Sequence, residues 1–449
     1  MGKWPRLRAA AQRTARPTSV DRRSQSRAPH TGALSHPAPT WKLRQSLAHA
    51  TAAGACAAEP RAPSKERRAS PFPVTGEQRT PVNWASGQAT GDGTRRFAAR
   101  HRAAFAPDFY RTLNGGVASG QLHVSSLGLG TYRGDCGPAD DTHYATAVRQ
   151  ALADGINVLD AAINYRCQRS ERAIGSALAA AIVDAVVARD EIVVCTKGGY
   201  IPLDGAAPSD RSEYHAYLRR AYFDPGIMSP EELVGDAHCL SPSFLRDQID
   251  RSRANLGLAT LDLYYLHNPE QQLDAIDQEL FASRLRAAFA LLEDRCIDGE
   301  IGFYGCATWS GLRVPPESRG HLSVALLARI AREVGGTNHH FRVIQLPINL
   351  ALTEAVRTPT QRLDDGRLVT VLEAAAEMGL GVVASSTLYQ ARLASGLPAA
   401  ISQALPGLDT DAQRAIAFVR GLPVVTTALV GMKTANHVRE NLAAARAAP

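Results

Sequence analysis

Four side chains that could take part in proton transfer follow short apolar segments typical of β-strands. They are Asp160, Tyr165, Lys197 and His267. A tyrosine hydroxyl has an ordinary pKa of about 10, and a neighbouring ammonium group lowers that pKa by stabilising the phenolate. A carboxylate can hold the ammonium in place, and a histidine can orient a substrate carbonyl. Brought together, the four groups would suit protonation of a substrate oxygen on which negative charge develops.

Eight strand-like segments would have to position these groups. They are expected at residues 125–132, 156–160, 192–197, 261–267, 301–308, 343–349, 381–388 and 426–432. Each of them starts 31 to 45 residues after the previous one, apart from a single gap of 69 residues. This near-regular alternation predicts a parallel (β/α)8 TIM barrel, whose active site lies at the carboxyl ends of the strands.

Helical segments are expected between the strands, because apolar residues recur there at positions i, i+3, i+4 and i+7. Three such stripes are Ile174, Ala177, Leu178 and Ala181; Leu285, Ala288, Phe289 and Leu292; and Leu368, Val371, Leu372 and Ala375. A one-sided stripe of this kind is typical of a helix that covers a sheet. A doubly wound sheet is the alternative fold. Against it, the glycine-rich segment Gly128–Arg133 ends in Arg and does not complete a G-x-G-x-x-G motif.

The long gap between the third and fourth strands contains a polar, proline-containing stretch at residues 201–240. Such an insertion would follow the carboxyl end of a strand, on the face where barrel active sites lie. It is therefore a candidate lid or substrate wall. A passive surface insertion is the other interpretation, and the sequence does not separate the two.

The sequence resembles the aldo-keto reductase superfamily over roughly residues 120–447. Asp160-Ala161-Ala162-Ile163-Asn164-Tyr165, followed by Ser170-Glu171-Arg172-Ala173-Ile174-Gly175, is similar to the family's tyrosine signature. Thr196-Lys197 resembles its lysine strand, and Tyr264-Tyr265-Leu266-His267 resembles its histidine strand.

The resemblance implies NADPH-dependent reduction of an aldehyde or ketone by direct hydride transfer, without a Rossmann fold. Tyr165 would be the general acid, with its pKa lowered by Lys197 paired to Asp160, and His267 would orient the carbonyl. The family's nicotinamide-binding Gln corresponds to Gln345, and Thr308 stands where an Asn is usual. Arg166 replaces a common glycine, and its charge could favour the phenolate or contact an acidic substrate. The cofactor candidates are Gly130, Thr131, Thr308, Gln345, Ser385, Gly431, Lys433, Thr434, His437 and Asn441.

Within the cofactor candidates, Lys433, Thr434 and His437 are expected at the 2′-phosphate, and Asn441 near the adenine. A helix N-terminus beside a lysine is a physically sound anion site. NADP is therefore expected rather than NAD. The resemblance also allows a second class of function, an NADPH-binding regulatory subunit that senses redox state with little or no turnover.

The net charge of +7 combines two unlike parts. Residues 1–100 hold 18 Lys and Arg against 5 Asp and Glu, whereas the remainder has a net charge of −6. The N-terminal part is rich in Ala, Arg, Pro and Ser and lacks hydrophobic periodicity, which predicts disorder. We expect a disordered extension at 1–87 and one barrel at 88–449. A transit peptide, a polybasic arm and a start codon placed too far upstream are the alternatives for the extension.

Several classes are disfavoured by composition. No apolar run approaches 18 residues, so no membrane span is expected. The seven cysteines are scattered and form no C-x-x-C pair, which argues against a zinc ribbon or disulfide scaffold and favours reduced thiols. No metal site and no nucleic-acid partner are expected. The expected partner is a small carbonyl substrate, and the expected compartment is the cytoplasm, or an organelle if the extension is a transit peptide. The oligomeric state is not indicated.

Overall fold

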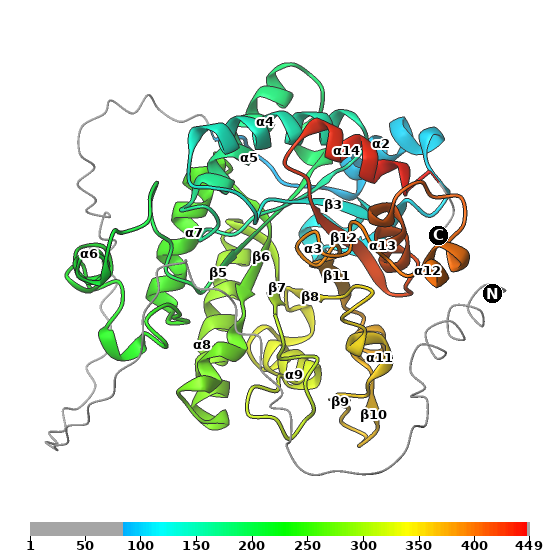
Figure 1. Ribbon diagram of the computed structural model, residues 1–449. Coiled ribbons are helices and arrows are strands. Elements are labelled where there is room, and N and C mark those ends of the chain that lie inside the picture. Colours follow the sequence, from blue (N-terminus) through cyan, green and yellow to red (C-terminus); the bar gives the residue numbers. More distant parts are fainter. Residues whose placement is uncertain (1–83, 447–449) are drawn as a thin grey trace, which may run out of the picture. The chain divides into compact units, whose positions relative to one another are not determined.

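Eight parallel strands close into a barrel in the computed structural model, which describes residues 84–446 (Figure 1). The strands are β3 (Leu127–Gly130), β4 (Val158–Asp160), β5 (Val193–Gly198), β6 (Leu261–His267), β7 (Ile301–Ala307), β8 (Phe341–Pro347), β11 (Gly381–Ser385) and β12 (Val425–Gly431). Their order around the barrel is β11-β12-β3-β4-β5-β6-β7-β8. All eight expected strands are present, and closure of the sheet rules out the doubly wound alternative. Disorder was expected for residues 1–87. Of these, residues 1–83 lie outside the described residues.

The strands form because their residues are apolar on both sides. β6 and β7 are buried along their whole lengths, as expected where a parallel strand faces both the barrel interior and a covering helix. The register brings the carboxyl ends level with one another. Asp160 pairs with Cys195, Lys197 pairs with Tyr265, and His267 pairs with Ala307. The polar residues that end these strands therefore meet at one mouth.

Helices surround the barrel (Figure 1). The main ones are α4 (Pro138–Ala153), α5 (Arg169–Val183), α7 (Pro242–Leu256), α8 (Gln278–Ile297), α9 (Val324–Gly335), α11 (Val371–Glu377), α13 (Asp411–Arg420) and α14 (Ala435–Ala443). The predicted stripes on α5 and α8 are buried in the main core. The third stripe is wrong at its first residue, because Leu368 lies in a short hairpin and is 42% exposed. A capping box of Thr370 and Glu373 starts α11 after it.

The hairpin that contains Leu368 pairs β9 (Gln361–Arg362) with β10 (Leu368–Val369). Shorter helices complete the loops at α3 (Gly116–Ser119), α10 (Glu354–Arg357) and α12 (Ala399–Ala404). Single 3-10 turns lie at Arg102–Ala104, Arg189–Glu191, Pro230–Glu232, Pro269–Asp274 and Gly336–Asn338. Within residues 84–446, no helix is both long and apolar enough to cross a membrane.

A segment that precedes the first barrel strand covers the amino ends of the strands. It comprises α2 (Gly91–His101) and a hairpin of β1 (Tyr110–Asn114) with β2 (Gln121–Ser125). Buried Asp262 accepts hydrogen bonds from the Ala89 backbone N–H at 2.6 Å and from the Arg189 guanidinium at 2.8 Å. Ala85 also donates its backbone N–H to Gly257. The segment therefore covers the amino-terminal face of the barrel, so a substrate would have to enter at the carboxyl-terminal face.

The insertion at 201–240 is a packed substructure. It contains α6 (Arg211–Leu218), a π-helical turn at Arg219–Phe223 and its own apolar cluster. Tyr222 is buried in that cluster and lies edge-on to Phe244 of α7 at 5.5 Å. The insertion is therefore anchored to the barrel through α7.

Candidate active site

Lys197 and Asp160 form a buried ion pair at the mouth of the barrel. The Lys197 Nζ lies 2.5 Å from Asp160 Oδ1 and also donates to the carbonyl of Ala161 at 2.7 Å. Burial alone would lower the pKa of Lys197, but the adjacent Asp160 carboxylate and the Tyr165 phenol reverse this, so the pKa lies above its ordinary value. The lysine is thus held as a cation by a fixed carboxylate.

Tyr165 lies against this pair. The Lys197 Nζ is 4.9 Å from the centre of the Tyr165 ring. Burial raises the pKa of Tyr165, and Lys197 opposes this without cancelling it, so the net direction is upward rather than downward as expected from the sequence. A tyrosine in this state carries its proton at neutral pH. It can therefore donate that proton to an oxygen that becomes basic.

His267 completes the cluster, with its ring centre 5.7 Å from that of Tyr165. The insertion supports it, because His238 Nε2 lies 2.8 Å from the His267 carbonyl oxygen. A carbonyl can only accept, so Nε2 must carry the hydrogen, and His238 Nδ1 then accepts from Gln272 Nε2 at 2.8 Å. Burial lowers the pKa of His238 to about 4, which keeps this tautomer neutral.

Aromatic rings flank the cluster on two sides. The Tyr132 ring lies edge-on to Tyr165 at 5.0 Å, and the Tyr200 ring lies edge-on to His267 at 4.9 Å. Asn268 donates its side-chain amide to the Tyr200 hydroxyl at 2.9 Å. Tyr200, His238 and Asn268 were not predicted from the sequence. The only available signal was their position directly after a barrel strand or within the insertion.

The loop after β7 is held by a buried carboxylate. Glu270 Oε1 accepts the backbone N–H groups of Trp309, Ser310 and Gly311 at 2.8, 3.1 and 3.2 Å. This fixes the segment that directly follows Thr308. That Glu270 would hold this loop was not predicted from the sequence.

The catalytic and cofactor candidates occupy different parts of the barrel wall. Asp160, Lys197 and His267 come from the neighbouring strands β4, β5 and β6. Most of the cofactor candidates lie on or directly after the remaining strands β7, β8, β11, β12 and β3, which are also neighbours, and His437 and Asn441 lie on α14, which follows β12. Gly130 and Gly431 pair directly. The mouth is therefore divided into a proton-transfer side and an opposite side.

The opposite side carries polar groups that suit an amide or phosphate-containing ligand. Gln345 donates to Asp160 Oδ2 at 2.9 Å and so joins the two sides. Thr308 is buried, and its hydroxyl has no hydrogen-bond partner within residues 84–446. The same holds for the hydroxyls of Ser386 and Thr387, directly after Ser385. Buried hydroxyls without partners are rare unless a ligand or water satisfies them.

The candidates for the adenosine phosphate lie at the N-terminus of α14. Thr434 is the N-cap residue and accepts from the His437 backbone N–H at 3.3 Å, and His437 is exposed. Lys433 Nζ lies 2.8 Å from Asp140 Oδ1 on α4. The hydrogen bond from Lys433 lowers the pKa of Asp140 to about 2. A phosphate bound here would have to share Lys433 with a carboxylate.

Two further cofactor candidates have structural contacts. Thr131 is buried and donates its hydroxyl to the Asp160 carbonyl at 3.0 Å, and its own carbonyl accepts from Ser170. Asn441 is buried on α14. Thr131 thus helps to position the strand end that carries Asp160.

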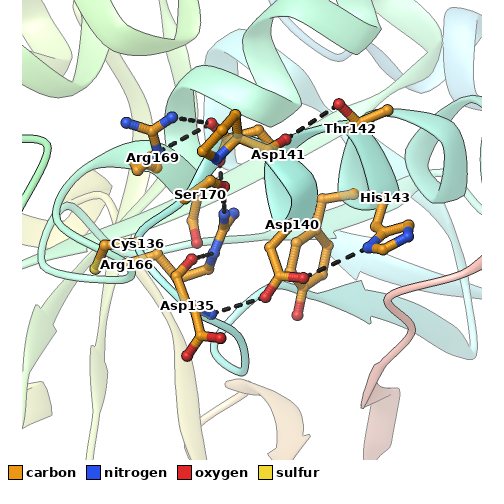
Figure 2. Close-up of polar contacts among 12 residues, drawn as sticks. Asp135, Cys136, Asp140, Asp141, Thr142, His143, Arg166, Arg169 and Ser170 are labelled. Atoms are coloured by element: carbon orange, nitrogen blue, oxygen red, sulfur yellow. Dashed lines mark hydrogen bonds and ion pairs between the residues drawn. The ribbon is translucent and has the colours of Figure 1, made fainter.

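Arg166 does not direct its charge into the mouth. Figure 2 shows its guanidinium turned toward Asp141, with Arg169 on the other side of the same carboxylate. The Arg166–Asp141 and Arg169–Asp141 separations are 2.6 and 2.5 Å. The Arg166 side chain is buried, and it also donates to the backbone carbonyls of Asp135 and Gly137. Of the two roles considered for Arg166, a contribution to the phenolate and a contact with an acidic substrate, neither is seen in these contacts, which instead hold the loop between β3 and α4.

Comparison with known proteins places this geometry in context. Residues 126–314 match the model of the aldo/keto reductase family. No curated protein sequence matches the chain. Among solved structures, the aldo-keto reductase AKR11C1 from Bacillus halodurans (holo form) aligns with a TM-score of 0.50 and 19% identity, over 76% of this chain and 91% of that one. An aldo/keto reductase from Klebsiella pneumoniae, in complex with NADP and acetate, aligns with a TM-score of 0.49 and 20% identity, over 73% and 88%.

Proposed function

We propose that the protein, whose residues 126–314 match the aldo/keto reductase family model, reduces an aldehyde or ketone to an alcohol with NADPH. The observation that carries the proposal is the buried Lys197–Asp160 pair directly against Tyr165. Such a pair is costly to bury. Its position beside the protonated Tyr165 would allow the Lys197 cation to stabilise the phenolate that forms when Tyr165 gives up its proton. The cytoplasm remains the expected compartment.

In this proposal each residue of the cluster has one task. Reduced nicotinamide, when bound, would supply the hydride. Tyr165 donates its proton to the carbonyl oxygen as negative charge develops there, and Lys197 stabilises the phenolate that remains. Asp160 keeps Lys197 in place. His267 donates a hydrogen bond that orients the carbonyl and is itself positioned by His238.

The cofactor would lie along the opposite side of the mouth. Thr308 and Gln345 would hold the carboxamide of the nicotinamide. Ser385, with Gly130, Thr131 and Gly431, would line the path of the pyrophosphate. Lys433, Thr434 and His437 would bind the 2′-phosphate at the N-terminus of α14, with Asn441 near the adenine. This set favours NADP over NAD.

The proposal is tested by Tyr165→Phe, which removes the proton and preserves the ring. We expect the rate of carbonyl reduction to fall by roughly 10²–10⁴-fold, while NADPH binding, followed by nucleotide fluorescence, is unchanged. Tyr110→Phe is the matched control, because its hydroxyl donates to Gly155 on the closed face of the barrel. Undiminished turnover in Tyr165→Phe would overturn the assignment. Tight NADPH binding by the wild type, without turnover of any carbonyl in a broad panel, would instead favour the regulatory subunit.

A further inference from the structure

Two cysteines lie together beside the turn that follows Tyr165. Cys136 is in the loop between β3 and α4 and is exposed, whereas Cys167 is buried and comes two residues after Tyr165. Their sulfur atoms are 2.8 Å apart. Within residues 84–446, no other pair of sulfur atoms lies within hydrogen-bond distance. The other four described cysteines therefore have no thiol neighbour.

The backbone on the Cys167 side is held in an uncommon conformation. Arg166, Cys167 and Gln168 have φ angles of 49°, 54° and 67°. Three consecutive left-handed residues other than glycine are sterically unfavourable and persist only where surrounding contacts fix them. Here the Cys167 carbonyl accepts from Gly205 at 3.0 Å, and Gln168 donates to Leu203 at 3.1 Å.

The Cys136 side is held by the same turn. Arg166 donates to the carbonyls of Asp135 and Gly137, the two residues that flank Cys136, at 3.0 and 3.3 Å. Figure 2 shows Cys136 beside Arg166 in this arrangement. The close approach of the two sulfur atoms thus follows from a framework of backbone contacts on both sides.

We propose that Cys136 and Cys167 are a reversible oxidation site, which forms a disulfide by exchange with small-molecule disulfides such as oxidised glutathione. A disulfide bond is about 2.05 Å long. The two sulfur atoms, 2.8 Å apart, therefore have only a small gap to close.

The exchange proceeds in two balanced steps. The exposed Cys136 thiolate attacks one sulfur of oxidised glutathione, forms a mixed disulfide and expels one glutathione thiolate. Cys167 then loses its proton and attacks the Cys136 sulfur, which forms the protein disulfide and expels the second glutathione thiolate. Two protein thiols are oxidised by two electrons, one glutathione disulfide is reduced to two thiols, and the protons pass to the leaving thiolates.

The order of attack follows from exposure. Burial raises the pKa of the Cys167 thiol to about 12, so Cys167 is a poor first nucleophile. Once Cys136 carries the glutathione, its sulfur is presented to Cys167 at contact distance. Cys136 is therefore the attacking thiol and Cys167 the resolving thiol.

The disulfide would tie the loop between β3 and α4 to the turn that carries Tyr165. The same loop contains Tyr132, whose ring contacts Tyr165, and leads into α4, where Asp140 pairs with Lys433. This consequence rests on the proposed function: a cross-linked loop should slow the entry and release of NADPH. Formation of the disulfide does not depend on it.

The test uses the full chain with Cys56→Ser, because Cys56 lies outside the described residues. The protein is incubated with graded ratios of oxidised to reduced glutathione, and thiols are counted and cross-linked peptides mapped by mass spectrometry. We expect loss of two thiols, one peptide pair joining Cys136 to Cys167, and a thermal midpoint raised by roughly 5 °C. Reduction should restore both thiols.

Three variants make the assignment specific. Cys167→Ser should stop at a mixed glutathione disulfide on Cys136, and Cys136→Ser should leave Cys167 unmodified. Cys296→Ser is the matched control and should behave as the parent. Three results with the parent protein would each overturn the proposal. They are a mixed disulfide that accumulates without the cross-link, a disulfide from Cys136 or Cys167 to another cysteine, and no loss of thiols at any glutathione ratio. Normal NADPH release from the cross-linked protein would refute only the effect on the cofactor.

Discussion

Replacement of Lys197 by methionine should destabilise the fold strongly, and a second substitution should recover part of the lost stability. Lys197→Met keeps the volume of the side chain but leaves the Asp160 carboxylate buried, with its side chain only 6% exposed and without its cation. Removing one partner of a buried ion pair typically costs about 3–5 kcal/mol. Gln345 still donates to Asp160 at 2.9 Å, which places the expected loss toward the lower end.

The double variant Asp160→Asn, Lys197→Met removes both charges. Because a neutral amide can still accept the hydrogen bond from Gln345, we expect the double variant to lie within about 2 kcal/mol of the wild type. The assay is urea unfolding followed by far-UV circular dichroism, with the two single variants and the double variant forming a cycle. All three variants should be inactive, so stability is measured independently of the chemistry. Losses that simply add in the double variant would refute the idea that the pair is coupled.

Three more outcomes follow from the site. His238 has a pKa of about 4 in the folded chain against 6.5 when unfolded, so its contribution to stability is present above pH 6.5 and is lost as the pH falls toward 4, by about 3 kcal/mol. His238→Gln should remove that dependence in acid unfolding, and an unchanged pH profile would contradict it. Asp140→Asn releases Lys433 and should tighten NADPH binding by roughly twofold to fivefold, whereas an equal gain for NADH in fluorescence titrations would contradict the 2′-phosphate assignment. Glu270→Gln replaces the carboxylate oxygen that accepts the three backbone N–H groups after Thr308 by a weaker, neutral amide acceptor, so we expect a several-fold rise in the KM for NADPH. An effect on kcat alone would count against that role.

The barrel could be predicted because its strands are continuous apolar segments separated by one-sided helical stripes. The hairpin of β1 and β2 was not predicted because its two strands are short, and their residues are largely polar and only partly buried. Leu368 was misassigned because a period of 3.6 continues by chance across the end of a hairpin. The capping box of Thr370 and Glu373 was the local signal that could have placed the helix start correctly.

The ion pair of the site could be predicted from the sequence, since Asp160 and Lys197 lie at the ends of neighbouring strands. The groups that position His267 were not, because His238, Gln272 and Tyr200 come from an insertion, a 3-10 turn and a strand end. Their contacts exist only after the insertion has packed on α7. The contact between Cys136 and Cys167 could not be predicted either, because the two residues are 31 positions apart and their spacing matches no motif. The direction of the Tyr165 pKa was also beyond sequence, because burial decides it.

The central claim is direct hydride transfer to a substrate carbonyl at the Tyr165–Lys197 site. Its most direct test is reduction of a panel of aldehydes and ketones with NADPH that carries deuterium at both C4 positions of the nicotinamide, followed by mass spectrometry of the alcohol products. With wild-type protein we expect one deuterium on the former carbonyl carbon of each alcohol, and with Tyr165→Phe we expect near-complete loss of the alcohol product itself. Alcohol products without deuterium, or tight NADPH binding with no alcohol from any member of the panel, would contradict it.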